Sequence, residues 1–127
     1  MSTLPVNLVT RGDPGKPWRM VLVEEGPWND AELESKLRGL QERLYDSVDA
    51  AIEGVLAQHY PGSRGQSVVI RVDGYNLPEG GVRSLVERFA ATMQILPEYV
   101  AAIAASDAVK EIGFEVNLER LPARDAA

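Results

Sequence analysis

Few side chains in this sequence are of the types that carry catalysis or bind metals. Its 127 residues include a single histidine, His59, and no cysteine. The lack of cysteine excludes disulfides, thiol catalysis, iron–sulfur clusters and every cysteine-based zinc site. A Ser-His-Asp catalytic triad would have to use His59, and a metal site with two histidine ligands is excluded. We therefore expect no catalytic residue, no metal and no cofactor.

Four acidic residues recur at helical spacing. Glu42, Asp46, Asp49 and Glu53 fall on one ridge of an expected helix, and like charges so placed weaken an isolated helix slightly. Such a ridge would attract a basic protein and speed its association. It is also what the solvated face of a helix in an acidic protein looks like, since the face opposite a core stripe has to be polar anyway. Both interpretations stay open.

A second candidate site follows an expected strand. Asp73, Tyr75 and Asn76, together with His59, could hold a small polar ligand, because α/β proteins often bind ligands at the carboxyl ends of strands. The run Asp73-Gly74-Tyr75-Asn76 is also what a tight turn uses. The same residues therefore support either a ligand site or a simple turn.

Two tryptophans, Trp18 and Trp28, each follow a proline and flank an expected strand. Facing outward, they would anchor a protein partner, because aromatic residues are enriched among interface hot spots. Facing inward, they would close the ends of the core. With the acidic ridge, they complete the partner-binding residues that the sequence suggests.

The charge balance restricts the partners. The chain has 13 Lys and Arg against 19 Asp and Glu, for a net charge of −6, and no basic stretch, which argues against nucleic acid and anionic membranes. The longest apolar run, 100–105, is far shorter than the roughly 20 residues that span a bilayer. The start of the chain does not resemble a signal peptide. We expect a cytoplasmic protein that binds another protein or itself.

The first half of the chain must supply a hairpin and a long helix. Alternation over residues 4–8, a Gly/Pro-rich turn, and the apolar run 18–25 predict two strands, the first at an edge and the second central. Asn29 and Glu32 form a capping pair that opens a helix over residues 30–59. An apolar stripe marks the core-facing side of this helix: Leu33, Leu37, Leu40, Leu44, Val48, Ala51, Ile52 and Val55.

The second half predicts a strand over 66–73, a loop over 73–81 and a helix over 82–96. Pro97 should break that helix and start a short one to residue 105. We expect a last helical turn through Val109 and Ile112 ended by Gly113, then a strand over 114–118 and a frayed tail over 121–127.

This order of strand, strand, helix, strand, helix, strand predicts an α+β fold. We expect one domain over residues 1–127, a two-layer sandwich in which two main helices cover one face of a four-stranded mixed sheet.

The stretch Trp18 to Asn29, WRMVLVEEGPWN, followed by a long amphipathic helix and the strand 68–73, resembles a family of small uncharacterised bacterial α+β domains. The resemblance covers about residues 18–76. It implies a small cytoplasmic bacterial protein of accessory or immunity type and carries over no catalytic residue.

The sequence thus favours a non-enzymatic protein-interaction domain, either an immunity protein or a self-associating one. The alternative is a small-ligand-binding or minor enzymatic domain with its site near the end of the third strand.

Overall fold

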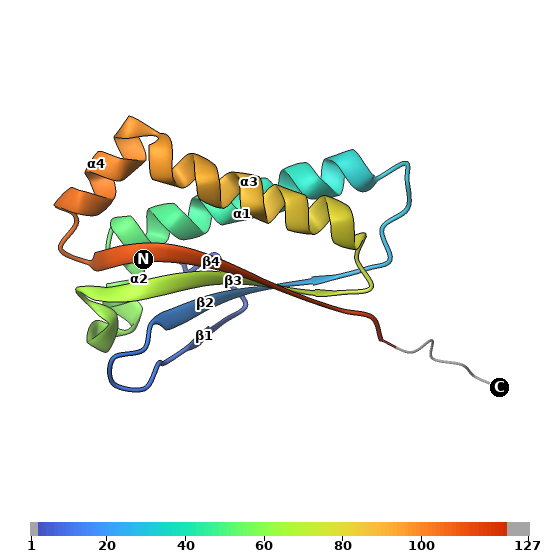
Figure 1. Ribbon diagram of the computed structural model, residues 1–127. Coiled ribbons are helices and arrows are strands. Elements are labelled where there is room, and N and C mark those ends of the chain that lie inside the picture. Colours follow the sequence, from blue (N-terminus) through green and yellow to red (C-terminus); the bar gives the residue numbers. More distant parts are fainter. Residues whose placement is uncertain (1–2, 122–127) are drawn as a thin grey trace.

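Four strands form one mixed sheet in the computed structural model, which describes residues 3–121 (Figure 1). The sheet order is β1-β2-β3-β4. β1 is antiparallel to β2, whereas β3 is parallel to β2 and β4 is parallel to β3. The strands are β1 (Leu8–Thr10), β2 (Trp18–Glu25), β3 (Gln66–Tyr75) and β4 (Val109–Glu119). The expected α+β class and mixed sheet are confirmed, and β1 and β4 are the edges.

The helices α1 and α3 lie on the same face of the sheet, and α4 follows α3 above the start of β4 (Figure 1). The helices are α1 (Leu33–Ile52), α2 (Val55–His59), α3 (Glu79–Ile95) and α4 (Pro97–Ala105), with a 3₁₀ turn, η1 (Pro61–Ser63). The short helix predicted from Pro97 to residue 105 is confirmed as α4, whereas α2 and η1 were not expected as separate elements.

The core lies between the sheet and α1 with α3. Alternate residues of β3, Val68, Ile70 and Val72, are buried beneath the helices, as alternation in a strand requires. From α1, Leu44 and Val48 are fully buried above them, so the apolar stripe predicted for this helix does face the core. We call the opposite side of the sheet, free of α1 and α3, the outer face.

The prediction of one continuous helix over residues 30–59 is wrong, because the structure has two helices there. Gly54 has φ 90°, a left-handed conformation that glycine adopts readily, and it separates α1 from α2. The predicted capping pair is confirmed: the Asn29 side chain accepts from the N–H of Glu32, and the Glu32 carboxylate accepts from the N–H of Asn29.

The helical turn predicted through Val109 and Ile112 is also wrong, because both residues belong to β4. Val109 is buried and pairs with Gln66 of β3, so strand pairing prevails over the local helical spacing. Gly113 lies within the strand opposite Val69 instead of ending a helix. The tail predicted over 121–127 lies, from residue 122 onward, outside the described residues.

The predicted loop over residues 73–81 starts too early in the sequence, because the strand before it is longer than expected. Strand β3 continues through Tyr75, and the turn starts at Asn76, whose φ is 60°. In the part of the chain that the structure describes, no helix is long and apolar enough to cross a membrane.

Candidate functional site

The acidic ridge lies on the side of α1 away from the sheet, and only part of it is free. Glu42, Asp46 and Glu53 are exposed, and within residues 3–121 none of them forms an ion pair. Asp49 is half-buried and accepts a hydrogen bond of 3.1 Å from the Tyr99 hydroxyl of α4. Three of the four acids can therefore meet a partner, whereas the fourth holds α4 against α1.

The hydroxyl of Tyr99, which bonds to Asp49 of the acidic ridge, has a raised pKa. Burial, reinforced by the hydrogen bond to Asp49, raises the pKa of Tyr99 from 10.0 to about 12. Since the raised pKa favours the neutral phenol, the stabilisation is complete below pH 10 and is lost as the pH rises through 12.

We expect absorbance titration of the folded protein to show one phenol deprotonating near pH 12. Tyr99→Phe should remove this phase, and the control Tyr60→Phe, on an exposed ring, should keep it. Survival of the phase in Tyr99→Phe would show that the high-pH group is a different tyrosine.

The structure does not assemble the second candidate site. His59 ends α2, just before the start of β3, whereas Tyr75 ends β3, and a ten-residue strand is roughly 33 Å long. His59 is therefore at the opposite end of the sheet from the other three residues. Sequence adjacency to the third strand was misleading because a strand carries the chain across the whole molecule.

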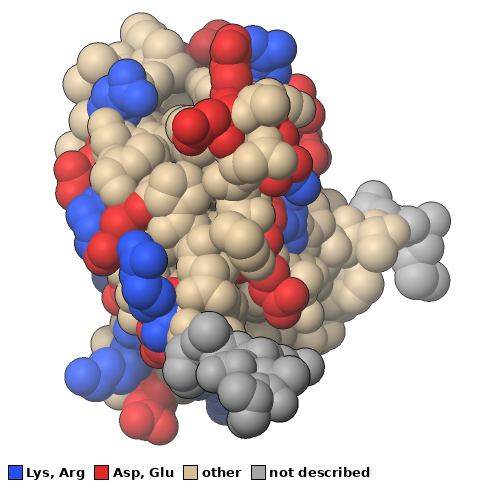
Figure 2. Space-filling model, turned by 90° about the vertical axis from the view of Figure 1, so that its right-hand side faces the viewer, with Lys and Arg blue, Asp and Glu red and all other residues tan. Residues whose placement is uncertain are grey.

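Of the remaining residues of that site, Asp73 and Tyr75 belong to β3, and only Asn76 lies in the turn that follows it. Asp73 accepts a hydrogen bond of 2.6 Å from Arg71, and the Asn76 side chain accepts one of 2.9 Å from the N–H of Leu121. At this end of the molecule acidic and basic side chains are interspersed (Figure 2). The tight turn predicted over residues 73–76 is therefore wrong in its position, because only Asn76 lies beyond β3, and the contacts of Asp73 and Asn76 give no support to the ligand site.

Trp18 and Trp28 are both half-buried and pack against the core. The Trp18 ring lies 5.9 Å from the Tyr60 ring, and the Arg11 guanidinium lies 6.0 Å from its centre. The Trp28 Nε1 is buried and has no hydrogen-bond partner among the described residues. Both rings therefore close the ends of the core, the inward alternative for these residues.

The outer face of the sheet is crossed by an ion pair. The Arg19 guanidinium of β2 reaches over β3 and donates two hydrogen bonds, of 3.0 and 3.3 Å, to the Glu115 carboxylate of β4. The hydrogen bond to Arg19 holds the pKa of Glu115 below its ordinary value, against the opposing effect of burial, and the charges of Arg19 and Arg71 add to the lowering. Half-exposed pairs of this kind contribute at most about 1 kcal/mol, so the pair mainly neutralises Glu115.

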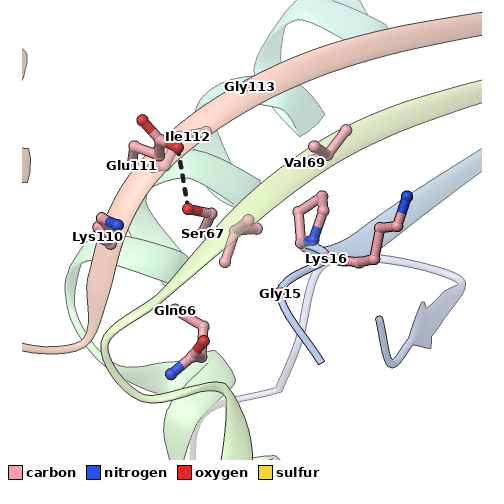
Figure 3. A pocket seen from close by; sticks show the side chains of 11 residues that line it. Gly15, Lys16, Gln66, Ser67, Val69, Lys110, Glu111, Ile112 and Gly113 are labelled. Atoms are coloured by element: carbon pink, nitrogen blue, oxygen red, sulfur yellow. Dashed lines mark hydrogen bonds between the residues drawn. The ribbon is translucent and has the colours of Figure 1, made fainter. Parts of the chain in front are cut away.

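A cleft of about 380 Å³ opens on the outer face where β3 and β4 begin (Figure 3). Lys16, from the loop between β1 and β2, and Lys110 of β4 lie on opposite sides of β3, and Ser67 donates a hydrogen bond of 3.0 Å to Glu111. Because both lysines and Glu111 are exposed, no buried polar group fixes a ligand here. Sequence reasoning missed this cleft, since its residues come from three separate segments.

Sequence reasoning also missed the role of β4 as an edge strand. Its outer edge has no neighbouring strand among residues 3–121, and β4 lies at the front of the sheet in Figure 1. At 11 residues it is the longest described strand. The alternation of Ile112, Phe114, Val116 and Leu118 signals the strand, but no local signal shows that it is an edge.

An apolar groove of about 340 Å³ runs beside this edge, between β4 and the helices α3 and α4. Ile112 and Phe114 form its β4 side, and Val100 and Ile103 form its α4 side. Val100, which lines the groove, is 45% exposed, and Ile95, at the end of α3, is 74% exposed. The edge and groove together form the apolar surface best suited to contact another protein.

The described residues contain no group of three or more histidine, aspartate or glutamate side chains that could hold a metal ion. Comparison with protein-family models, with curated proteins and with solved structures finds no match to this chain. The resemblance to small bacterial α+β domains therefore stays a prediction, and the function must be argued from the molecule itself.

Proposed function

We propose that this protein is a non-enzymatic protein-interaction domain of the bacterial cytoplasm, built as a two-layer sandwich. The observation that carries the proposal is the outer edge of β4, which pairs with no strand of the described part of the chain and lies beside an apolar groove. An edge strand presents a row of N–H and C=O groups that bind a further strand, and the groove offers apolar surface for its side chains.

The geometry gives less support to the ligand-binding or enzymatic alternative. His59 lies far from Asp73, Tyr75 and Asn76, and the Asp73 and Asn76 side chains already accept hydrogen bonds within their own end of the sheet. A general base needs a reacting group within hydrogen-bond distance and a partner that orients it. Binding through a surface needs no such convergence.

Photo-crosslinking in the native cell tests the proposal. A photoreactive amino acid at Asn117, a half-buried position of β4, should give a discrete crosslinked protein product. The matched control places the same group at the exposed Lys36 of α1, a helix that is not part of the sheet edge. A product at Asn117 and not at Lys36 supports the proposal, and equal or absent products at the two positions overturn it.

The acidic ridge supports a second version of the same function, an immunity protein that blocks a basic, nuclease-like toxin. The exposed and unpaired Glu42, Asp46 and Glu53 favour it, because an uncompensated charged surface steers an oppositely charged partner.

For this version the variant Glu42→Lys/Asp46→Lys/Glu53→Lys leaves Asp49 and its bond to Tyr99 intact. It should slow association with the product of an adjacent toxin gene by at least about tenfold at low salt, and less at high salt. The control, which reverses Glu79, Glu87 and Glu98 of α3 and α4, has the same net charge. Equal slowing by the two triple variants would reject the ridge.

A further inference from the structure

We infer that the partner of the β4 edge is a second copy of this chain, bound by antiparallel pairing of the two β4 strands about Phe114. The inference rests on the proposed function and names its partner. Pairing of this kind joins the two sheets into one continuous sheet, with α3 and α4 of both copies on the same face.

The outer edge of β4 lacks most of the features that keep edge strands single. Natural edges are short, or carry lysine, proline or a bulge. In β4 the lysine and the irregular pairing with β3 are confined to the start, at Lys110 and its neighbour Glu111. From Ile112 to Leu118 the pairing with β3 is regular, and this stretch contains neither lysine nor proline.

The opposite edge of the sheet is built differently. Strand β1 has only 3 residues, Leu8 to Thr10, and is the kind of short edge that resists further pairing. The contrast between the two edges selects β4 as the pairing strand.

The side chains of β4 fit a second copy in the register centred on Phe114. This register pairs the whole strand with itself, because Phe114 is its middle residue. On the face towards the helices, Ile112 then faces Val116 of the second copy. Such aliphatic cross-strand pairs stabilise a sheet.

The charges on the outer face fit the same register. Glu115 faces Gly113 of the second copy, where there is no side chain to oppose it, and Glu111 faces Asn117. Moving the centre by one residue would place Glu115 opposite itself or opposite Glu111, and directly opposed like charges destabilise a strand pair. The Arg19 guanidinium, already bound to Glu115, further neutralises this acid at the centre of the interface.

The apolar groove lies where the second copy arrives. Ile112 and Phe114 line this groove, and they, like Val116, are half-buried in a strand whose outer edge has no neighbouring strand among residues 3–121. A paired strand covers these apolar side chains and forms hydrogen bonds with the backbone groups of the edge. One contact therefore removes both the side chains and the backbone groups from water.

Sedimentation equilibrium of the full chain over the micromolar range tests the inference. We expect a mass of twice 13.9 kDa at the high end of the range, with dissociation on dilution. Val116→Lys should give a monomer at every concentration, since a lysine on the edge blocks pairing. The matched control Leu8→Lys, on the β1 edge, should remain a dimer. A wild-type monomer throughout, or dissociation by Leu8→Lys and not by Val116→Lys, overturns the inference.

A second measurement covers the case in which Val116→Lys fails to fold. Because the chain has no cysteine, introduced thiols are the only ones present. Gly113→Cys and Glu115→Cys proteins, mixed under mild oxidation, should form a disulfide-linked heterodimer at least about tenfold faster than a mixture of Leu8→Cys and Glu115→Cys, because directly opposite residues bring their Cβ atoms close enough for a disulfide. Equal rates in the two mixtures overturn the register and the inference.

These outcomes separate the inference from the proposed function. A crosslinked product at Asn117 whose mass differs from that of two chains supports an interaction domain and rejects the second copy as its partner. The absence of any product rejects both.

Discussion

Leu44→Ala is expected to lower the free energy of unfolding by about 3 kcal/mol, because a buried leucine loses its transfer free energy and leaves a cavity. Leu44 is 0% exposed and lies on the face of α1 that packs over the sheet. Its neighbours in the core, Leu40 and Val48, come from the same helix, so they have little freedom to close the cavity.

The matched control is Ile95→Ala. Ile95 is 74% exposed at the end of α3, so its truncation should change stability by no more than about 0.5 kcal/mol. Urea denaturation of both variants, at one low protein concentration, makes the comparison. Equal losses would mean that α1 does not cover the sheet as described.

Gly26→Ala should be nearly as damaging, by about 2 kcal/mol or more, because the added methyl group has no room. An ideal Cβ at Gly26 would overlap the backbone carbonyl oxygen of Asn76 and lie 2.9 Å from its carbon. The backbone at Asn76 cannot yield easily, since its N–H donates to Glu119 and Gly26 donates to Tyr75.

Gly39→Ala is the control for this second change. A Cβ at Gly39 meets nothing within 4 Å, and alanine favours a helix interior over glycine by up to about 1 kcal/mol. Thermal unfolding should therefore show a lower midpoint for Gly26→Ala and a higher one for Gly39→Ala. The same direction of change in both would contradict the close approach of residues 26 and 76.

Local patterns in the sequence predicted much of the fold. The apolar stripe of α1 and the Asn29–Glu32 capping pair depend on residues a few positions apart, and both appear as expected. The break at Gly54 was harder to predict, because glycine within a helical pattern permits a break without requiring one.

The errors arose where distant segments decide the structure. The stretch from Val109 to Ile112 has helical spacing, but it forms a strand because it pairs with the start of β3. His59 and Tyr75 both adjoin β3 in the sequence, but the strand runs between them and places them at opposite ends of the sheet.

The candidate interaction surface could not be predicted for a similar reason. The alternation of Phe114, Val116 and Leu118 indicates a strand, but whether that strand is central or at an edge depends on the strand order of the whole sheet. The groove beside it needs α4 as well, whose Val100 approaches β4 only in the folded chain.

The central claim is that the outer edge of β4 is paired in solution with β4 of a second copy, and amide hydrogen exchange followed by NMR tests it most directly. Alternate N–H groups between Ile112 and Leu118 point away from β3. At high protein concentration we predict that these outward amides are protected, and that dilution or Val116→Lys removes their protection while the amides facing β3 keep theirs. Outward amides that exchange as rapidly as those of exposed loops at every concentration would contradict the claim.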